Sequence, residues 1–137
     1  MPQVHASCIA WDGQGLLIRG ASGSGKSSLA LELMALGARL VADDRVDLTV
    51  SGAALVARCP DPLSGLIEAR GIGILNARPF GPVALSTVVD LDTEETMRLP
   101  PRRTVTLEGV SLALFYKVST PSFAAALAHY LRGGRHA

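Results

Sequence analysis

The sequence predicts an α/β domain in which a mixed, largely antiparallel sheet is accompanied by one helix after a glycine-rich loop and a second helix at the C-terminus. Residues 20–27 fit the pattern G-x-x-x-x-G-K-[ST], which marks a phosphate-binding loop between a strand and a helix. From 46 to 115 the chain consists mainly of short β-prone runs separated by glycine and proline. Most proteins with such a loop alternate strands and helices in a parallel sheet, so the shortage of helices indicates a different sheet.

The glycine-rich loop is the first candidate binding site. Its residues are Gly20, Ala21, Ser22, Gly23, Ser24, Gly25, Lys26 and Ser27. Glycines let the backbone fold into a nest of N–H groups that bind phosphate oxygens. Lys26 can reach the β- and γ-phosphates, and the Ser27 hydroxyl can bind Mg²⁺. An apolar run at 15–19 precedes the loop and a helix-forming run at 28–36 follows it, ending at Gly37, so phosphates would lie at a helix N-terminus. The alternative is a Gly/Ser-rich turn that fits by chance.

Length and composition exclude several classes of protein. With 137 residues we expect one domain, 1–137, and with only 4% aromatic residues we expect an aliphatic core. A net charge of +1 argues against binding of nucleic acid. The N-terminus lacks the features of a signal peptide, and no run approaches the roughly 18 apolar residues of a membrane span. We therefore expect a cytoplasmic protein in which Cys8 and Cys59 are buried or idle thiols.

The N-terminal run at 4–11 and the run at 16–18 flank Asp12-Gly13, which predicts a β-hairpin. A hairpin returns its two ends to the same side. His5 should therefore lie beside Gly20 and the phosphate site.

Two adjacent carboxylates, Asp43 and Asp44, follow a short apolar strand at 38–42. The carboxyl end of a strand beside the phosphate loop is where a metal-binding or base carboxylate is needed. Successive strand residues point to opposite faces, so we expect one carboxylate to face the nucleophile and the other the metal. The alternative is a solvated Asp-Asp turn.

The middle of the chain is predicted to contain a hairpin at 46–58, a proline-rich loop at 59–65 and an apolar strand at 66–76. Glu68 and Arg70 would share one face of that strand, and its two glycines suggest a bend or a close backbone approach. Spacing alone does not decide whether the charged pair is an internal ion pair or part of a site.

The C-terminal part is predicted to begin with a central strand at 83–91 and a solvated acidic turn at 92–96. Two paired strands at 104–107 and 110–115 follow, and then a helix at 123–131 and a frayed tail at 132–137.

Four segments together resemble the catalytic domain of HPr kinase/phosphorylase, the bacterial enzyme that phosphorylates a serine of a phosphocarrier protein. They are His5, the loop at 20–27, Leu40-Val41-Ala42-Asp43-Asp44-Arg45-Val46 and Ile67-Glu68-Ala69-Arg70-Gly71-Ile72-Gly73-Ile74. The likeness runs from His5 to about residue 80 and more weakly to Phe115. The chain is most similar to the short, single-domain forms, without the separate N-terminal domain of longer members.

This resemblance implies a fold related to phosphoenolpyruvate carboxykinase, ATP and Mg²⁺ as cofactors, an HPr-like substrate and a homo-oligomer, a hexamer by the same likeness. It implies that Asp43 is the general base, that His5 tunes or orients it, and that Arg70 holds the site or the phosphate. Ser27 and Glu68 would bind Mg²⁺ with Asp44 as a helper. The family can also remove the seryl phosphate with inorganic phosphate, but the arginine that longer members carry in a Gly-Arg-Asn motif is missing at 109–111.

Two other functions remain open. The chain could be a nucleotide-binding regulatory module without catalysis, or a small-molecule kinase of carboxykinase-like fold. A pure binder has no use for a base beside the γ-phosphate, and a small-molecule kinase needs a deep pocket with basic residues, for which Arg39, Arg45 and Arg70 are the candidates.

Overall fold

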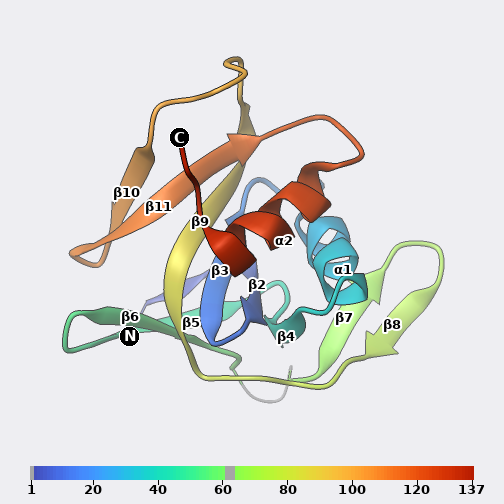
Figure 1. Ribbon diagram of the computed structural model, residues 1–137. Helices are drawn as coiled ribbons and strands as arrows, with labels where there is room; N and C mark the ends of the chain where they lie inside the picture. The colour runs from blue at the N-terminus through green and yellow to red at the C-terminus, as the bar shows by residue number, and fades with distance from the viewer. Residues whose placement is uncertain (1, 61–63) are drawn as a thin grey trace.

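The computed structural model describes residues 2–60 and 64–137 (Figure 1). Two helices are formed, α1 (Lys26–Ala35) and α2 (Phe123–Gly133). The strands are β1 (Gln3–Val4), β2 (Ala6–Trp11), β3 (Gln14–Arg19), β4 (Arg39–Ala42), β5 (Val46–Ser51), β6 (Ala54–Arg58), β7 (Leu66–Ala69), β8 (Gly73–Asn76), β9 (Val83–Glu94), β10 (Arg103–Leu107) and β11 (Val110–Lys117). Both helices and the three predicted hairpins are therefore present.

The long strand β9 organises the sheet. It runs parallel to β3 and to β11, while its first residues pair antiparallel with β6. The main sheet has nine strands. Seven of them follow the order β1-β5-β6-β9-β3-β2-β4, while β11 pairs with β9 and β10 is attached through β11. All other pairs are antiparallel, which confirms the mixed sheet, and Figure 1 shows it curling around the molecule.

The sheet is buried on both faces, which explains its near-continuous apolar runs. In β3, Leu16 and Ile18 face a core that includes α1 and α2, whereas Leu17 faces the core under β5, β6 and β11. In β9 the neighbouring residues Val88 and Val89 also point to opposite faces of the sheet. Val89 packs in the core that includes α1 and α2, and Val88 packs in the core under β5, β6 and β11.

The apolar segment at 66–76 is a hairpin and not the single strand that its composition predicts. Ile72 N donates to Ala69 O at 2.9 Å, and β7 and β8 form a separate two-stranded sheet. Gly71 has a φ of +84°, which an L side chain rarely adopts, so the chain turns here. Arg70 consequently lies in the turn and does not share a strand face with Glu68.

The prediction of a turn at 92–96 is wrong, although Asp92, Thr93, Glu94 and Thr96 are exposed as predicted. The strand β9 continues to Glu94, and Glu95 forms hydrogen bonds of 3.0 Å with both Nε and Nη2 of Arg103. The Glu95 side chain is 8% exposed.

The C-terminal tail is also more ordered than predicted. The helix α2 extends to Gly133, and Arg135 Nη2 donates to Pro100 O at 2.7 Å. The tail is thereby held against the segment that leads into β10.

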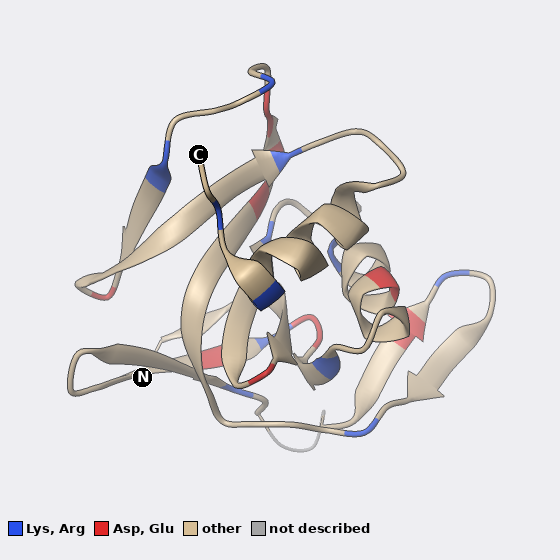
Figure 2. Ribbon diagram, viewed as in Figure 1, with Lys and Arg blue, Asp and Glu red and all other residues tan. Residues whose placement is uncertain are grey.

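Cys8 lies fully buried in β2, and this burial raises the pKa of its thiol, as expected for an idle core cysteine. Figure 2 shows acidic and basic residues interspersed around the elements, in line with the small net charge. Neither helix that the structure describes has the length and apolar character needed to cross a bilayer.

Candidate active site

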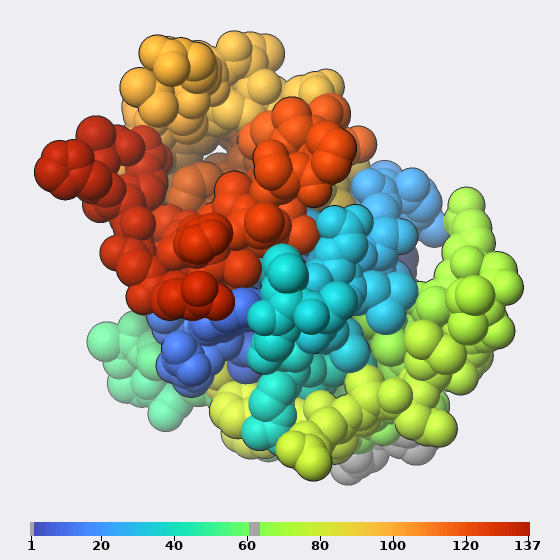
Figure 3. Space-filling model, turned by 45° about the vertical axis from the view of Figure 1, so that its right-hand side comes forward, coloured from blue at the N-terminus to red at the C-terminus, as the bar shows by residue number. Residues whose placement is uncertain are grey.

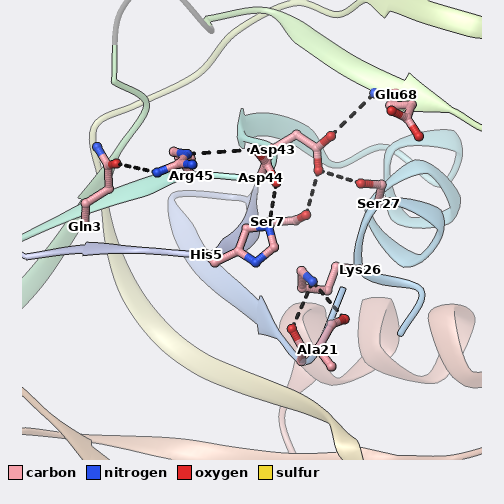
Figure 4. A network of polar contacts seen from close by, with 11 residues as sticks. Gln3, His5, Ser7, Ala21, Lys26, Ser27, Asp43, Asp44, Arg45 and Glu68 are labelled. Atoms are coloured by element: carbon pink, nitrogen blue, oxygen red, sulfur yellow. Dashed lines mark hydrogen bonds and ion pairs between the residues drawn. The ribbon is translucent and has the colours of Figure 1, made fainter. Parts of the chain in front are cut away.

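The phosphate loop joins the end of β3 to the start of α1. Gly20, Gly23 and Gly25 all have positive φ values, +155°, +83° and +102°. At Gly20 a Cβ would come within 2.5 Å of Ser24 Oγ, so the loop can close only without a side chain there. Lys26 is 7% exposed, and its Nζ donates to the carbonyl oxygens of Gly20 at 2.9 Å and Ala21 at 3.1 Å (Figure 4). The ammonium group is thus held inside the curve of the loop.

A cavity of about 670 Å³ opens beside this loop. It is lined by Lys26 and Ser27 of the loop, by Asp43 and Asp44 after β4, by His5 and Ser7 at the start of the first hairpin, and by Glu68 and Arg70 of the β7–β8 hairpin. Every predicted catalytic and metal-binding residue therefore reaches one cavity. In the space-filling view the β7–β8 hairpin stands apart from the loop and α1, with a hollow between them (Figure 3).

Asp43 is the buried carboxylate of the pair, 8% exposed. Its Oδ1 accepts hydrogen bonds of 2.7 Å from Ser7 Oγ and from Ser27 Oγ, and its Oδ2 accepts a longer bond of 3.4 Å from Glu68 N. Figure 4 shows these contacts converging from three elements. Asp43 consequently fixes the first turn of α1 and the β7–β8 hairpin relative to the sheet.

Asp44 points elsewhere because β4 ends at Ala42 and the backbone of Asp44 turns to a φ of +73°. Its Oδ1 lies 2.6 Å from His5 Nε2, and the side chains of His5 and Asp44 are 52% and 61% exposed. A carboxylate only accepts, so Nε2 carries the proton of this hydrogen bond. The expected contact of His5 with Asp43 is therefore not formed: among the described residues, His5 bonds to Asp44.

The two ends of the first hairpin meet as predicted. The register pairs Ala6 with Arg19, which places His5 next to the start of the loop. The adjacent carboxylates take different partners, Ser27 for Asp43 and His5 for Asp44. Their predicted division between a nucleophile and a metal stays a prediction.

The model of the HPr Serine kinase C-terminal domain matches residues 1–94, well over half of the chain. The chain belongs to that family.

Relatives in the HPr kinase family share up to about half of their aligned residues with this chain. The HPr kinase/phosphorylase of Leptothrix cholodnii is 50% identical over 93 residues, and that of Polaromonas naphthalenivorans is 45% identical over 93 residues. Each alignment covers 62% of this chain but 29% of the relative, so the chain spans less than a third of their length. The solved HPr(Ser) kinase/phosphatase structure from Coxiella burnetii superposes with a TM-score of 0.76 over 96% of this chain and 95% of that one. At 24% identity this likeness concerns the fold.

The residues of this site fit a magnesium ion that would be held jointly with phosphate oxygens. Among the residues that the structure describes, no three His, Cys, Asp or Glu side chains are placed to hold a metal. Mg²⁺ needs fewer protein ligands, because one or two carboxylates with phosphate oxygens and waters complete its shell. Ser27 and Asp43 supply adjacent hard oxygens, and Glu68 lines the same cavity. Asp44, the predicted helper, faces His5 instead.

Two residues of the site are absent from the sequence-based prediction. Ser7 is fully buried and bonds to Asp43, and its position two residues after His5 would have placed both on one face. Asp92 accepts hydrogen bonds from Ala21 N with Oδ1 at 2.9 Å and Oδ2 at 3.1 Å. Because β9 runs parallel to β3, the C-terminal end of β9 lies beside the loop. The acidic residues that follow the predicted strand at 83–91 could therefore have indicated Asp92 as a contact of the loop.

Proposed function

We propose that this HPr kinase domain transfers the γ-phosphoryl group of ATP to a serine of an HPr-like phosphocarrier protein. The observation that carries the proposal is the convergence, in one cavity, of a phosphate loop, a partly buried Ser27–Asp43 pair and an exposed His5–Asp44 pair. The first two features are needed to hold a nucleotide, and the third is needed to deprotonate an alcohol.

Phosphoryl transfer depends on alignment and on neutralising the charge of the phosphates. Lys26 and the loop N–H groups would bind the phosphates, while Ser27, Asp43 and Glu68 would hold Mg²⁺. When bound, that ion supplies charge neutralisation between the phosphates. Ser24 Oγ is buried and has no hydrogen-bond partner within 2–60 and 64–137, which fits a loop that receives a polar ligand.

The geometry supports Asp44, and not Asp43, as the general base. Asp43 already accepts three hydrogen bonds and lies against the loop serine, the position that a metal-binding aspartate takes in P-loop enzymes. Within the described residues, the Asp44 side chain has one hydrogen-bond partner, His5, while Arg45 Nε lies 3.9 Å from its Oδ2, and the carboxylate is exposed at the cavity. In the proposed step the serine proton passes to Asp44, the serine oxygen bonds to the γ-phosphorus, and the bond from that phosphorus to the bridging oxygen of ADP breaks. His5 orients Asp44 and stabilises its charge.

The surroundings of the cavity favour a protein substrate over a small anionic one. The apolar side chains of Leu66 and Ile74 line the same cavity and are 38% and 63% exposed. Of the three arginines that a small-molecule pocket could use, only Arg70 lines this cavity. Arg39 stacks over Phe80 at 4.7 Å, and Arg45 bonds to Gln3 at 3.3 Å.

The test is to incubate the protein with Mg²⁺, ATP radiolabelled in its γ-phosphate and purified phosphocarriers of the sugar and the nitrogen systems. We expect label on a carrier serine, and none with Asp44→Asn. Addition of excess inorganic phosphate then tests the reverse reaction, in which label would leave as pyrophosphate. ATP binding without labelling of any carrier would favour the regulatory module.

Three further properties follow from the family likeness and stay predictions. They are the relation of the fold to phosphoenolpyruvate carboxykinase, a location in the cytoplasm and a hexameric assembly. Light scattering of the purified protein measures the last of these directly.

A further inference from the structure

A second cavity, of about 410 Å³, lies on the other side of the phosphate loop. Gly25 and Ser28 line both cavities, so the two meet at the N-terminal turn of α1. From that turn, Ser27 faces Asp43, whereas Ser28 and Glu32, four residues apart on one helix face, line the second cavity. The far wall comes from the end of β11 and the start of α2.

We infer that this second cavity binds the nucleoside part of the nucleoside triphosphate, an inference that rests on the proposed function. The triphosphate occupies the loop, and its γ end must face Asp44 in the first cavity. The α end then faces away from Asp44, toward Ser28 and the second cavity. A volume of about 410 Å³ is within the range of roughly 300–1,000 Å³ typical of small-molecule sites.

The lining matches the chemistry of a base and a ribose. Leu29 and Leu91 form apolar walls, and the half-buried ring of Phe123 offers a face on which a base can stack. The exposed carboxylate of Glu32 can accept hydrogen bonds from ribose hydroxyls. Lys117, at the end of β11, adds a cation beside the α-phosphate end.

This site draws on a part of the chain that the family match does not include. Residues 117–123 lie beyond residue 94, where that match ends. The pairing of β11 with β9 places them there, because β11 runs parallel to β9 and ends at the same edge as β3.

The experiment compares ATP with inorganic tripolyphosphate, both with Mg²⁺, by titration calorimetry. We expect the unchanged protein to bind ATP more tightly than tripolyphosphate. Phe123→Ala should weaken ATP binding about tenfold or more while leaving tripolyphosphate unaffected. Phe80→Ala is the matched control, since Phe80 is also half-buried but lies outside both cavities. Equal affinities for the two ligands in the unchanged protein, or equal losses for both in Phe123→Ala, overturn the nucleoside site.

A second variant tests the contact with the ribose and leaves the packing of the Phe123 ring intact. The unchanged protein should bind ATP about tenfold more tightly than 2′-deoxy- or 3′-deoxy-ATP, and Glu32→Ala, which removes the acceptor, should bring that ratio close to one. A ratio that Glu32→Ala leaves unchanged overturns the role of Glu32. If the unchanged protein binds neither ATP nor tripolyphosphate, the proposed function itself fails and the nucleoside site fails with it. That outcome is distinct from binding of tripolyphosphate with no gain from the nucleoside.

Discussion

Ser27 Oγ donates a hydrogen bond of 2.7 Å to Asp43 Oδ1, which joins the first turn of α1 directly to the residue after β4. The neighbouring Asp44 bonds to His5 at 2.6 Å instead. Two adjacent carboxylates thus serve different partners, and substitutions at the two positions should have different effects.

Asp44→Asn should lower kcat for carrier phosphorylation by about 10²- to 10⁴-fold, because it removes the general base. Nucleotide binding should persist, since Asp44 does not contact the loop. Asp43→Asn should instead raise the Mg²⁺ concentration needed for half-maximal rate. Steady-state assays over a series of Mg²⁺ concentrations measure both effects. A variant Asp44→Asn that works at the normal rate would return the base role to Asp43.

Lys26→Met should weaken ATP binding by about 10- to 100-fold, because a buried charged donor to the phosphates is lost. Calorimetric titration with ATP and Mg²⁺ gives the affinity. Arg39→Met is the matched control, because Arg39 is a cation that lies over Phe80 and outside the cavity. If Lys26→Met binds ATP as the unchanged protein does, residues 20–27 are not the nucleotide site.

Asp92→Ala should reduce both stability and ATP affinity, because Ala21 N loses its acceptor and the loop loses its anchor on β9. For one charge-assisted hydrogen bond at an exposed site we expect about 1 kcal/mol, or a decrease in Tm of about 3 °C. Asp92→Asn keeps a carbonyl acceptor and should recover part of both losses. Thermal unfolding with and without ATP separates the two effects, and an Asp92→Ala protein with unchanged ATP affinity would show that the loop needs no such anchor.

Glu95 gives a prediction for pH. Its hydrogen bonds with Arg103, followed by smaller contributions from backbone N–H groups and the charge of Arg103, hold the pKa of the Glu95 carboxyl below its ordinary value of 4.5. A lowered pKa means that the stabilisation is fully present above pH 4.5 and is lost as the pH falls through the lower, folded-state value.

Denaturant unfolding of the unchanged protein and of Glu95→Gln should therefore differ by a constant amount above pH 4.5, and the difference should shrink in more acidic solution. A difference that grows on acidification would contradict the ion pair. Arg103→Gln should behave like Glu95→Gln.

The elements that were predicted from sequence are those with a local cause. Alternation with a period of two and the turn at Asp12-Gly13 suffice for the first hairpin, and the glycines at 20, 23 and 25 suffice for the loop. The place of His5 followed from the same hairpin, because an antiparallel register is fixed by its turn.

The parts that sequence missed depend on contacts between distant segments or on one backbone angle. Asp92 and Ala21 are separated by 71 positions, and only the pairing of β9 with β3 brings them together. Asp44 faces His5 because its own φ is positive, which alternation along a strand does not reveal. Arg70 does not lie on the same strand face as Glu68, because the chain turns at Gly71.

The position of β9 between β3 and β11 has a consequence for the time at which the site forms. During synthesis the phosphate loop is complete long before the strand that anchors it, because β9 follows β3 by more than sixty positions and β11 comes later still. Parallel pairings between such distant segments form slowly, since the chain must close a long loop before the contact stabilises it. A nascent chain whose residue 94 has not yet emerged from the ribosome therefore contains the loop without its Asp92 anchor. Nucleotide binding should mark one of the last events in the folding of this protein.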